Sequence, residues 1–217
     1  MRLPKTTIAL TTGLLLLGLT GCSTSQIYAG NKKVGAYFVL PKKWHPISNN
    51  SLNQKEAEST EPGAADKLSR VQWQEAYSTN LGVTPGEVFS LKTPKGALAY
   101  VRVRLLSSAE LNAVSYNSLR DIVVPLSQWA TGTDKTAPVF NISDDYEIVD
   151  KAARGVHTIY DFIGSDNVSQ TINQSSLVTN DHRTLYVLLI RSSSKFYNAH
   201  EKELKKIADS FTVRGTN

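Results

Sequence analysis

The clearest pattern along the chain is the run of apolar and alternating positions toward its C-terminal end. Residues 156–163 are predicted to form a strand with two alternating faces, and residues 169–178, which are rich in Gln, Ser and Thr, are predicted to be its partner strand. Residues 185–190 are almost wholly apolar, which indicates a central strand that is buried on both faces. Tight turns at 164–167 and 180–183 separate these segments. The pattern therefore predicts an antiparallel meander of three strands.

Further strands are predicted at 34–40, 68–77, 97–106, 146–149 and, as a short edge strand, 211–214. Within 97–106, Arg102 and Arg104 project from one face, about 6–7 Å apart along the strand. They could contact an anionic ligand or lipid headgroup, or they could pair with local carboxylates. Trp44, which follows the first strand, is interpreted as a core residue; the alternative is a ring that stacks on a ligand.

Helices are predicted where apolar residues recur at spacings of three and four. Residues 115–129 have this spacing, and Pro125 kinks the predicted helix or splits it in two. A last helix is expected over 196–210, with Ser194 as its cap. Thr84-Pro85-Gly86-Glu87 has the form of a capping box and predicts a short helix or turn.

Polar stretches divide these elements. Residues 47–67 and 131–141 are expected to be loops, because they are rich in polar and turn-forming residues. Residues 22–33 are small and polar and are interpreted as a tether. The folded domain is accordingly assigned to residues 34–217.

The first residues resemble a bacterial lipoprotein signal. A short basic start precedes an apolar run, residues 6–19, that is shorter than the roughly 20 residues a spanning helix needs. Leu19-Thr20-Gly21 directly before Cys22 is similar to a lipobox. The resemblance implies that residues 1–21 are a signal peptide and that Cys22 becomes the acylated first residue of the mature chain. The alternative is an uncleaved apolar segment followed by an ordinary cysteine.

Lipid attachment at Cys22 would place the domain on the extracytoplasmic face of the cell membrane. One acyl chain binds a bilayer only marginally, so two or three are needed for stable anchoring. Ser23 after the cysteine is compatible with the outer membrane if the envelope is Gram-negative. Because Cys22 is the single cysteine, its acylation excludes disulfides and cysteine metal sites.

The charge balance argues against a nucleic-acid partner. The whole chain has a formal net charge of +5. Loss of Arg2 and Lys5 with the signal peptide would reduce this to +3 (5 − 2). Basic residues do not cluster with interleaved aromatic residues, as they do in nucleic-acid-binding proteins. The expected membrane contact is therefore through covalent lipid.

Motifs for catalysis are sparse. The chain has neither a Gly-x-Ser-x-Gly elbow nor a glycine-rich phosphate loop. His157 and Asp161 share a strand face, but about 13 Å separates their Cα atoms, so they cannot bind one metal; His157 could meet a neighbouring side chain such as Gln174. Turn formation explains the other hard-ligand candidates, Asp144, Asp145, Asp181 and His182. We expect no catalytic residues, no metal and no cofactor.

Two stretches resemble the PsbP-like family: Phe38-Val39-Leu40-Pro41-Lys42-Lys43-Trp44 and Ile207-Ala208-Asp209-Ser210-Phe211-Thr212-Val213. The order of elements over most of residues 34–214 is similar too. The family includes the photosystem II extrinsic subunit, a Ran-binding nuclear import factor and LpqN-type lipoproteins. The resemblance implies an α+β fold, an antiparallel sheet with helices on both faces. It transfers no functional residue, and it suggests a docking or accessory module.

Three functional hypotheses follow. The leading one is a non-enzymatic, membrane-anchored binding or accessory module of the cell envelope. Its partner would be an envelope protein, a lipid or a small ligand, held in a groove between helix 115–129 and the sheet. The alternative is an envelope hydrolase or metal-dependent enzyme that uses His157, Asp161 or His182. A photosystem accessory protein is the weaker alternative.

Overall fold

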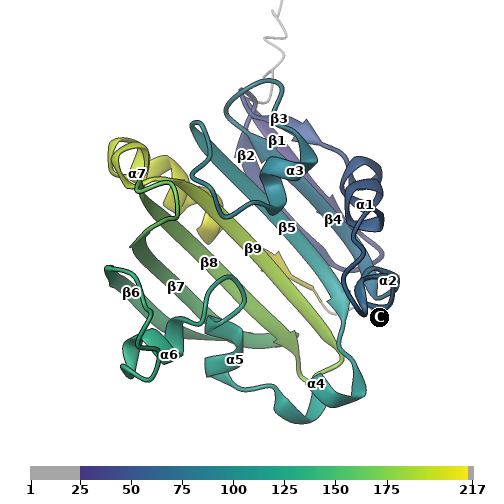
Figure 1. Ribbon diagram of the computed structural model, residues 1–217. Coiled ribbons are helices and arrows are strands. Elements are labelled where there is room, and N and C mark those ends of the chain that lie inside the picture. Colours follow the sequence, from purple (N-terminus) through teal and green to yellow (C-terminus); the bar gives the residue numbers. More distant parts are fainter. Residues whose placement is uncertain (1–24, 215–217) are drawn as a thin grey trace, which may run out of the picture.

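The computed structural model describes residues 25–214, which form two antiparallel sheets (Figure 1). The larger sheet has seven strands, in the spatial order β3 (His45–Ile47), β4 (Val71–Ser78), β5 (Ala97–Leu105), β9 (Thr184–Ser193), β8 (Ser169–Thr179), β7 (Ala153–Ile163) and β6 (Phe140–Val149). The smaller sheet consists of β1 (Gln26–Asn31), β2 (Ala36–Pro41) and β10 (Thr212–Val213). A single sheet was expected, and the chain has two because β1, β2 and β10 pair only among themselves.

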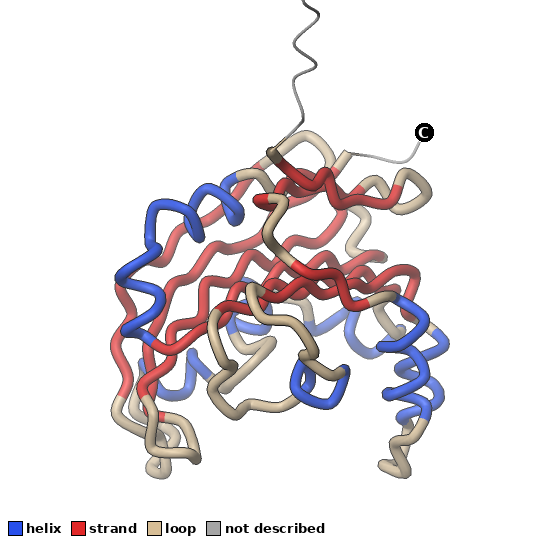
Figure 2. The backbone as a smooth tube through the Cα atoms, turned by 90° about the horizontal axis from the view of Figure 1, so that it is seen from above, coloured by secondary structure: helices blue, strands red, loops and turns tan. Residues whose placement is uncertain are grey.

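Helices lie on both faces of the larger sheet, as the resemblance to the PsbP-like family implies (Figure 2). Helix α7 (Ser194–Asp209) and the smaller sheet cover one face, where Leu188, Phe38 and Leu204 belong to the largest apolar core. Short helices cover the opposite face. They are α1 (Asn49–Ala57), α2 (Ala64–Ser69), α3 (Pro85–Phe89), α4 (Ser108–Ala113), α5 (Tyr116–Arg120) and α6 (Leu126–Ala130).

The predicted meander is confirmed. Strands β7, β8 and β9 pair antiparallel in continuous register. β9 is the middle strand of the seven and is buried on both faces, with Leu188 on the α7 side and Val187 on the other. Trp44 is 1% exposed within the main core, which confirms its interpretation as a core residue.

Residues 26–31, which were assigned to a tether, form strand β1 and pair with all of β2. The tether interpretation is therefore wrong for these residues. Their composition is small and polar, but Ala29 is buried and Ile27 packs against the core. The exposed face of the strand carries Tyr28 and Gly30, which hid the alternation.

The polar stretch 47–67 is not a loop, because it contains α1 and α2. Ser48 caps α1 by accepting a hydrogen bond from the amide of Ser51 at 3.2 Å. Only Leu52 is buried in α1. A helix with one buried side chain has no apolar period for a sequence pattern to detect.

The predicted helix over 115–129 is split into α5 and α6, the second of the two outcomes expected at Pro125. Pro125 has no amide hydrogen and directly precedes α6. Asp121 accepts a hydrogen bond from Ser127 N at 2.7 Å, which ties the connecting segment to the start of α6. Leu119 and Trp129 are buried against the sheet.

Several boundaries differ from the predictions. Strand β4 begins at Val71 and not at residue 68, because α2 continues to Ser69. Strand β6 begins at Phe140, inside the predicted loop, and is longer than the predicted 146–149. A bulge between Ile142 and Asp144 breaks its alternation, and this edge strand is mostly exposed. The cap of α7 is Ser193 rather than Ser194, since Ser193 Oγ accepts a hydrogen bond from Phe196 N at 3.2 Å.

Candidate functional site

Arg102 and Arg104 extend from the same face of β5, and each is paired with a carboxylate. Arg102 Nη1 lies 2.7 Å from Glu56 Oε1 of α1. Arg104 donates to both oxygens of Glu110, at 2.7 and 3.1 Å. Of the two interpretations of this pair, the structure supports local pairing with carboxylates.

The two arginines line a groove of about 520 Å³ over β5 and β9. Its floor is apolar along β9, where Leu185, Val187 and Leu189 share one strand face. Side chains of the surrounding helices and of the α5–α6 segment form its walls, among them Lys67, Phe89, Glu110 and Ile122. A concave, largely apolar surface with a few polar groups is typical of small-molecule sites. This is not the groove expected between helix 115–129 and the sheet, because that stretch contributes only Ile122 to its lining.

The charged groups of the groove form a compensated cluster. Arg70 pairs with Asp66 and lies 3.6 Å from Glu110. Partial burial alone would raise the pKa of Glu110, but hydrogen bonds from Arg104 and from the capped turn at Ser107 lower it to about 2. Among residues 25–214, Lys67 is the lining cation without a carboxylate within ion-pair distance.

Helix α3 is fixed over one side of the groove by Arg191 of β9. This guanidinium is 4% exposed and donates to the backbone oxygen of Ser90 at 2.6 Å and of Glu87 at 3.4 Å. Its burial lowers the pKa of Arg191 to about 10. Phe89 consequently packs edge-on against Tyr100, with 5.9 Å between ring centroids. Burial raises the pKa of Tyr100 to about 12, so its phenol stays protonated at neutral pH.

Glu56 and Glu110 are site residues that the sequence analysis missed. Glu56 lies in a helix that has no apolar period. Glu110 had a detectable signal, because Ser107-Ser108-Ala109-Glu110 is a capping box: Ser107 Oγ accepts from Glu110 N at 3.2 Å, and Glu110 accepts from Ser107 N at 2.7 Å. The same carboxylate caps α4 and binds Arg104, so one motif positions both.

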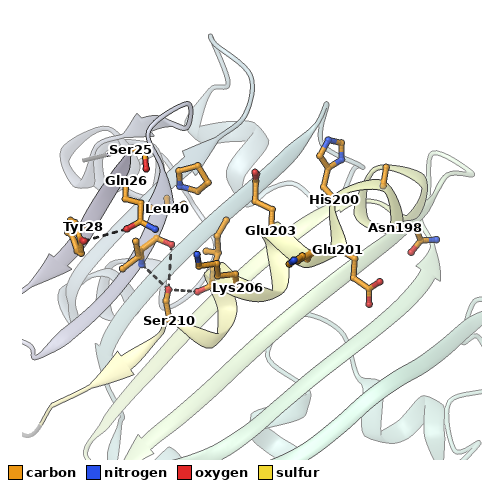
Figure 3. A pocket seen from close by; sticks show the side chains of 15 residues that line it. Ser25, Gln26, Tyr28, Leu40, Asn198, His200, Glu201, Glu203, Lys206 and Ser210 are labelled. Carbon is orange, nitrogen blue, oxygen red and sulfur yellow. Dashed lines mark hydrogen bonds between the residues drawn. The ribbon is translucent and has the colours of Figure 1, made fainter. Parts of the chain in front are cut away.

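A larger concavity, about 890 Å³, lies between α7 and strands β1 and β2 (Figure 3). Glu203 at its rim pairs with Lys43 at 2.9 Å, and Glu201 pairs with Lys205 at 2.8 Å. Ser210 Oγ accepts a hydrogen bond from Val39 N at 2.9 Å and joins α7 to β2. This concavity is more open to solvent than the groove over β5 and β9, which has an apolar strand floor, so that groove is the better candidate site.

His157 lies on the α7 side of β7 and is 4% exposed. Its Nδ1 is 3.0 Å from Ser175 Oγ, and its ring stacks on Tyr146 with 4.8 Å between centroids. The expected contact of His157 with Gln174 is wrong. Ser175 lies directly opposite His157 in β8, and Gln174 faces the other side of the sheet. Burial lowers the pKa of His157 and favours the neutral ring.

The residues of the enzyme hypothesis do not meet. Asp161 accepts hydrogen bonds from Thr171 Oγ1 and, at 3.1 Å, from Ser194 Oγ. His182 lies in the β8–β9 turn, where Nε2 contacts Arg154. These two residues and His157 therefore have separate partners. A hydrolase or metal site built on them would need at least two to converge on a third polar group.

Asp144 and Asp145 lie in strand β6, so their assignment to a turn is wrong, and the acidic candidates are dispersed. Asp145 accepts from Arg120 Nε at 3.0 Å, and Asp181 accepts from Thr179 Oγ1 at 2.6 Å. His182 has a positive φ of 59°, as expected of a turn residue. Over the part of the chain that the structure describes, no three His, Cys, Asp or Glu side chains gather as metal ligands would.

Cys22, the predicted lipid-attachment residue, and the predicted signal peptide lie outside the described residues. Among the helices within 25–214, none is long and apolar enough to cross a bilayer. The first described residue, Ser25, lies beside the end of β2, where its backbone oxygen accepts a hydrogen bond from Lys42 N at 3.0 Å.

Neither a family profile nor a curated relative matches the sequence. Cyanobacterial PsbP (CyanoP) from Synechocystis has a similar solution structure, with a TM-score of 0.51 at 13% identity over 91% of this chain and 99% of that chain. LpqN of Mycobacterium tuberculosis, involved in cell envelope biogenesis, gives 0.45 at 10% identity over 87% and 90% of the chains. The Ran-binding protein Mog1p of Saccharomyces cerevisiae gives 0.44 at 9% identity over 88% and 96%. The similarity to cyanobacterial PsbP shows that the chain has a PsbP-like α+β fold.

Proposed function

We propose that the chain is an accessory lipoprotein of the cell envelope that binds an amphipathic anion in the groove over β5 and β9. The groove is the observation that carries this proposal. Its apolar floor of Val187 and Leu189 suits an acyl or aromatic body, and Lys67 with Arg70 at the rim suits a carboxylate or phosphate head. The three arginines already pair with carboxylates, so they attract a further anion only weakly. The apolar part of the ligand therefore supplies much of the affinity.

A fluorescent fatty acid, 11-(dansylamino)undecanoic acid, tests the groove. The full chain should enhance its emission in a saturable way. Leu189→Trp places a larger side chain on the floor of the groove and should abolish saturable binding of the probe. Val149→Trp, at an exposed position of β6, should leave that binding unchanged. Equal binding by both variants would contradict the proposal.

The head-group contact has its own test. Lys67→Ala should weaken binding of the anionic probe by about tenfold, the effect of roughly 1.4 kcal/mol. Binding of the corresponding methyl ester, which has no charge, should be unaffected. Similar losses for the acid and the ester would place the anion elsewhere.

Membrane anchoring at Cys22 is supported by the resemblance of Leu19-Thr20-Gly21-Cys22 to a lipobox. Cys22→Ala should lose labelling by an alkynyl fatty acid and should leave the membrane fraction. A variant that remains acylated would contradict the assignment. Cys22→Ala retains the groove, so probe binding by this variant separates the anchor from the ligand site.

The non-enzymatic assignment is supported by the separate partners of His157, Asp161 and His182. A photosystem accessory role is supported by the shared fold with cyanobacterial PsbP alone, and a fold hosts many functions.

A further inference from the structure

One end of the larger sheet carries an unusual share of exposed apolar side chains. At this end β4 and β7 finish and β5, β6 and β8 begin, so the connecting loops lie together along the upper left of the sheet in Figure 1. Five large apolar residues in or beside these loops are exposed: Leu81, Leu91, Val139, Ile163 and Val168. Leu81 and Val139 are the most exposed of the five, at 80% and 75%.

Hydrogen bonds connect these loops into a continuous rim. Asn80 Nδ2 donates to Lys95 O at 2.6 Å, within the β4–β5 connection. Thr93 N donates to Asp166 Oδ2 at 2.8 Å, between that connection and the β7–β8 turn. The backbone of Ile163 donates to Val139 O at 3.1 Å, which adds the segment before β6. We call residues 79–83, 90–96, 139 and 163–168 the loop rim.

The loop rim lies at the same end of the molecule as the first described residue. Ser25 contacts the β2–β3 connection through Lys42 N, and β3 begins beside the last residue of β4. Ser25 lies three positions after Cys22, and three steps of extended chain span at most about 11 Å. A lipid on Cys22 would therefore hold Ser25, at this end of the molecule, within about 11 Å of the bilayer, with the loop rim on the same side.

The charges at this end suit an anionic surface. Lys42, Lys92 and Lys95 have no carboxylate within ion-pair distance among the described residues. Asp166, the acidic residue of the β7–β8 turn, is engaged by the amides of Thr93 and Val168. Apolar tips between uncompensated lysines are typical of surfaces that lie in the headgroup region of a membrane.

We propose that the loop rim is a membrane-contact surface that docks on anionic lipid beside the Cys22 anchor. This inference rests on the proposed acylation of Cys22, which sets the position of the bilayer. The apolar tips enter the headgroup region, and the lysines bind lipid phosphates. In this orientation the sheet stands with its opposite end, where Val149 is 77% exposed, away from the membrane.

A thiol label tests the orientation, because acylation of Cys22 leaves an introduced cysteine as the single free thiol. The acylated full chain carrying Leu81→Cys or Val149→Cys is labelled with a nitrobenzoxadiazole dye. It is then reconstituted into vesicles of phosphatidylglycerol and phosphatidylcholine. The Leu81 label should emit at shorter wavelength and be quenched by a headgroup spin-labelled lipid, whereas the Val149 label should remain solvent-like.

The outcomes separate this inference from the anchor. Lys92→Glu with Lys95→Glu should reduce the Leu81 response in phosphatidylglycerol vesicles toward that in phosphatidylcholine alone. If mass spectrometry and vesicle flotation show an acylated, bound chain whose two labels respond alike, the loop rim is not the contact. A Leu81 response that depends on protein concentration rather than lipid charge would assign the rim to a second copy. An unacylated chain would remove both the anchor and this inference.

Discussion

Arg102 of β5 and Glu56 of α1 form an ion pair, 2.7 Å between Nη1 and Oε1, at the centre of a polar network beside the groove. Arg102 Nη1 also donates to Tyr100 OH at 3.1 Å, and Gln74 Nε2 donates to Glu56 Oε2 at 2.7 Å. The two charged side chains are 18% and 21% exposed. Removal of either partner therefore leaves the other charge poorly hydrated.

Arg102→Ala is expected to reduce the free energy of unfolding by about 2–3 kcal/mol, because it leaves the carboxylate of Glu56 partly buried without an ion-pair partner. Lys205→Ala is the matched control, because the pair of Lys205 with Glu201 is exposed and is worth less than about 1 kcal/mol. Urea unfolding followed by circular dichroism measures both. Equal losses of unfolding free energy in the two variants would show that the Arg102–Glu56 pair stabilises the fold no more than an exposed ion pair does.

Acid should weaken the fold through Glu110, whose pKa is lowered to about 2 by Arg104 and the Ser107 turn against the effect of burial. A carboxylate whose pKa is lowered by folding stabilises the native state at pH values above its pKa in the unfolded chain. This contribution is lost as the pH falls from about 4.5 to about 2. The side chain is 38% exposed, so screening limits the contribution to roughly 1 kcal/mol.

Glu110→Gln should accordingly be less stable than the parent at pH 7, and the two should converge toward pH 2. Urea unfolding across this range provides the measurement. A constant difference at every pH would mean that the carboxylate acts through packing and not through its charge.

His157 predicts a second, separate pH effect. Burial lowers its pKa, while Asp144 and Asp209 partly offset the shift. The unfolded chain therefore binds a proton more readily, so stability should fall as the pH drops below about 6.5. His157→Gln should show a flatter profile between pH 7.5 and 5. An unchanged slope in that range would assign the pH dependence to other groups.

Gly155 of β7 has no room for a side chain, because an added Cβ would lie 1.9 Å from the backbone oxygen of Ser176. Gly155→Ala should destabilise the fold by about 2–4 kcal/mol through displacement of β8. Gly86→Ala in α3 is the control, since its nearest neighbour would be 3.6 Å away; helix propensity predicts a change of less than about 1 kcal/mol. Thermal unfolding distinguishes the two.

Elements with strong periodic burial could be predicted from the sequence, and elements held by polar contacts could not. Strand β9 is apolar on both faces, so its central place was evident. Helix α1 buries Leu52 alone and is attached to the sheet through Glu56 and Asn53, which bond Gln74. Such contacts form only after strands distant in sequence have paired, so they cannot be predicted from a local sequence pattern.

The candidate site shows the same division. The projection of Arg102 and Arg104 from one face followed from strand geometry. Their carboxylate partners could not be predicted in this way, because Glu56 lies in a helix that precedes β5 in the sequence and Glu110 in one that follows it. The apolar floor of the groove belongs to β9, whose pairing with β5 requires the register of the complete sheet.

The pairing of β5 with β9 also has a consequence for how the protein folds. Residues 106–183 separate these two strands, and residues 42–211 separate β2 from β10. A chain that emerges from the ribosome N-terminus first therefore exposes the open edge of Ala97–Leu105 until strand Thr184–Ser193 is available. Contacts between such distant segments form slowly, and unpaired edges invite aggregation in the meantime. Strands β9 and β10 close the two sheets, so the native fold can form only after residues 184–213 have been synthesised.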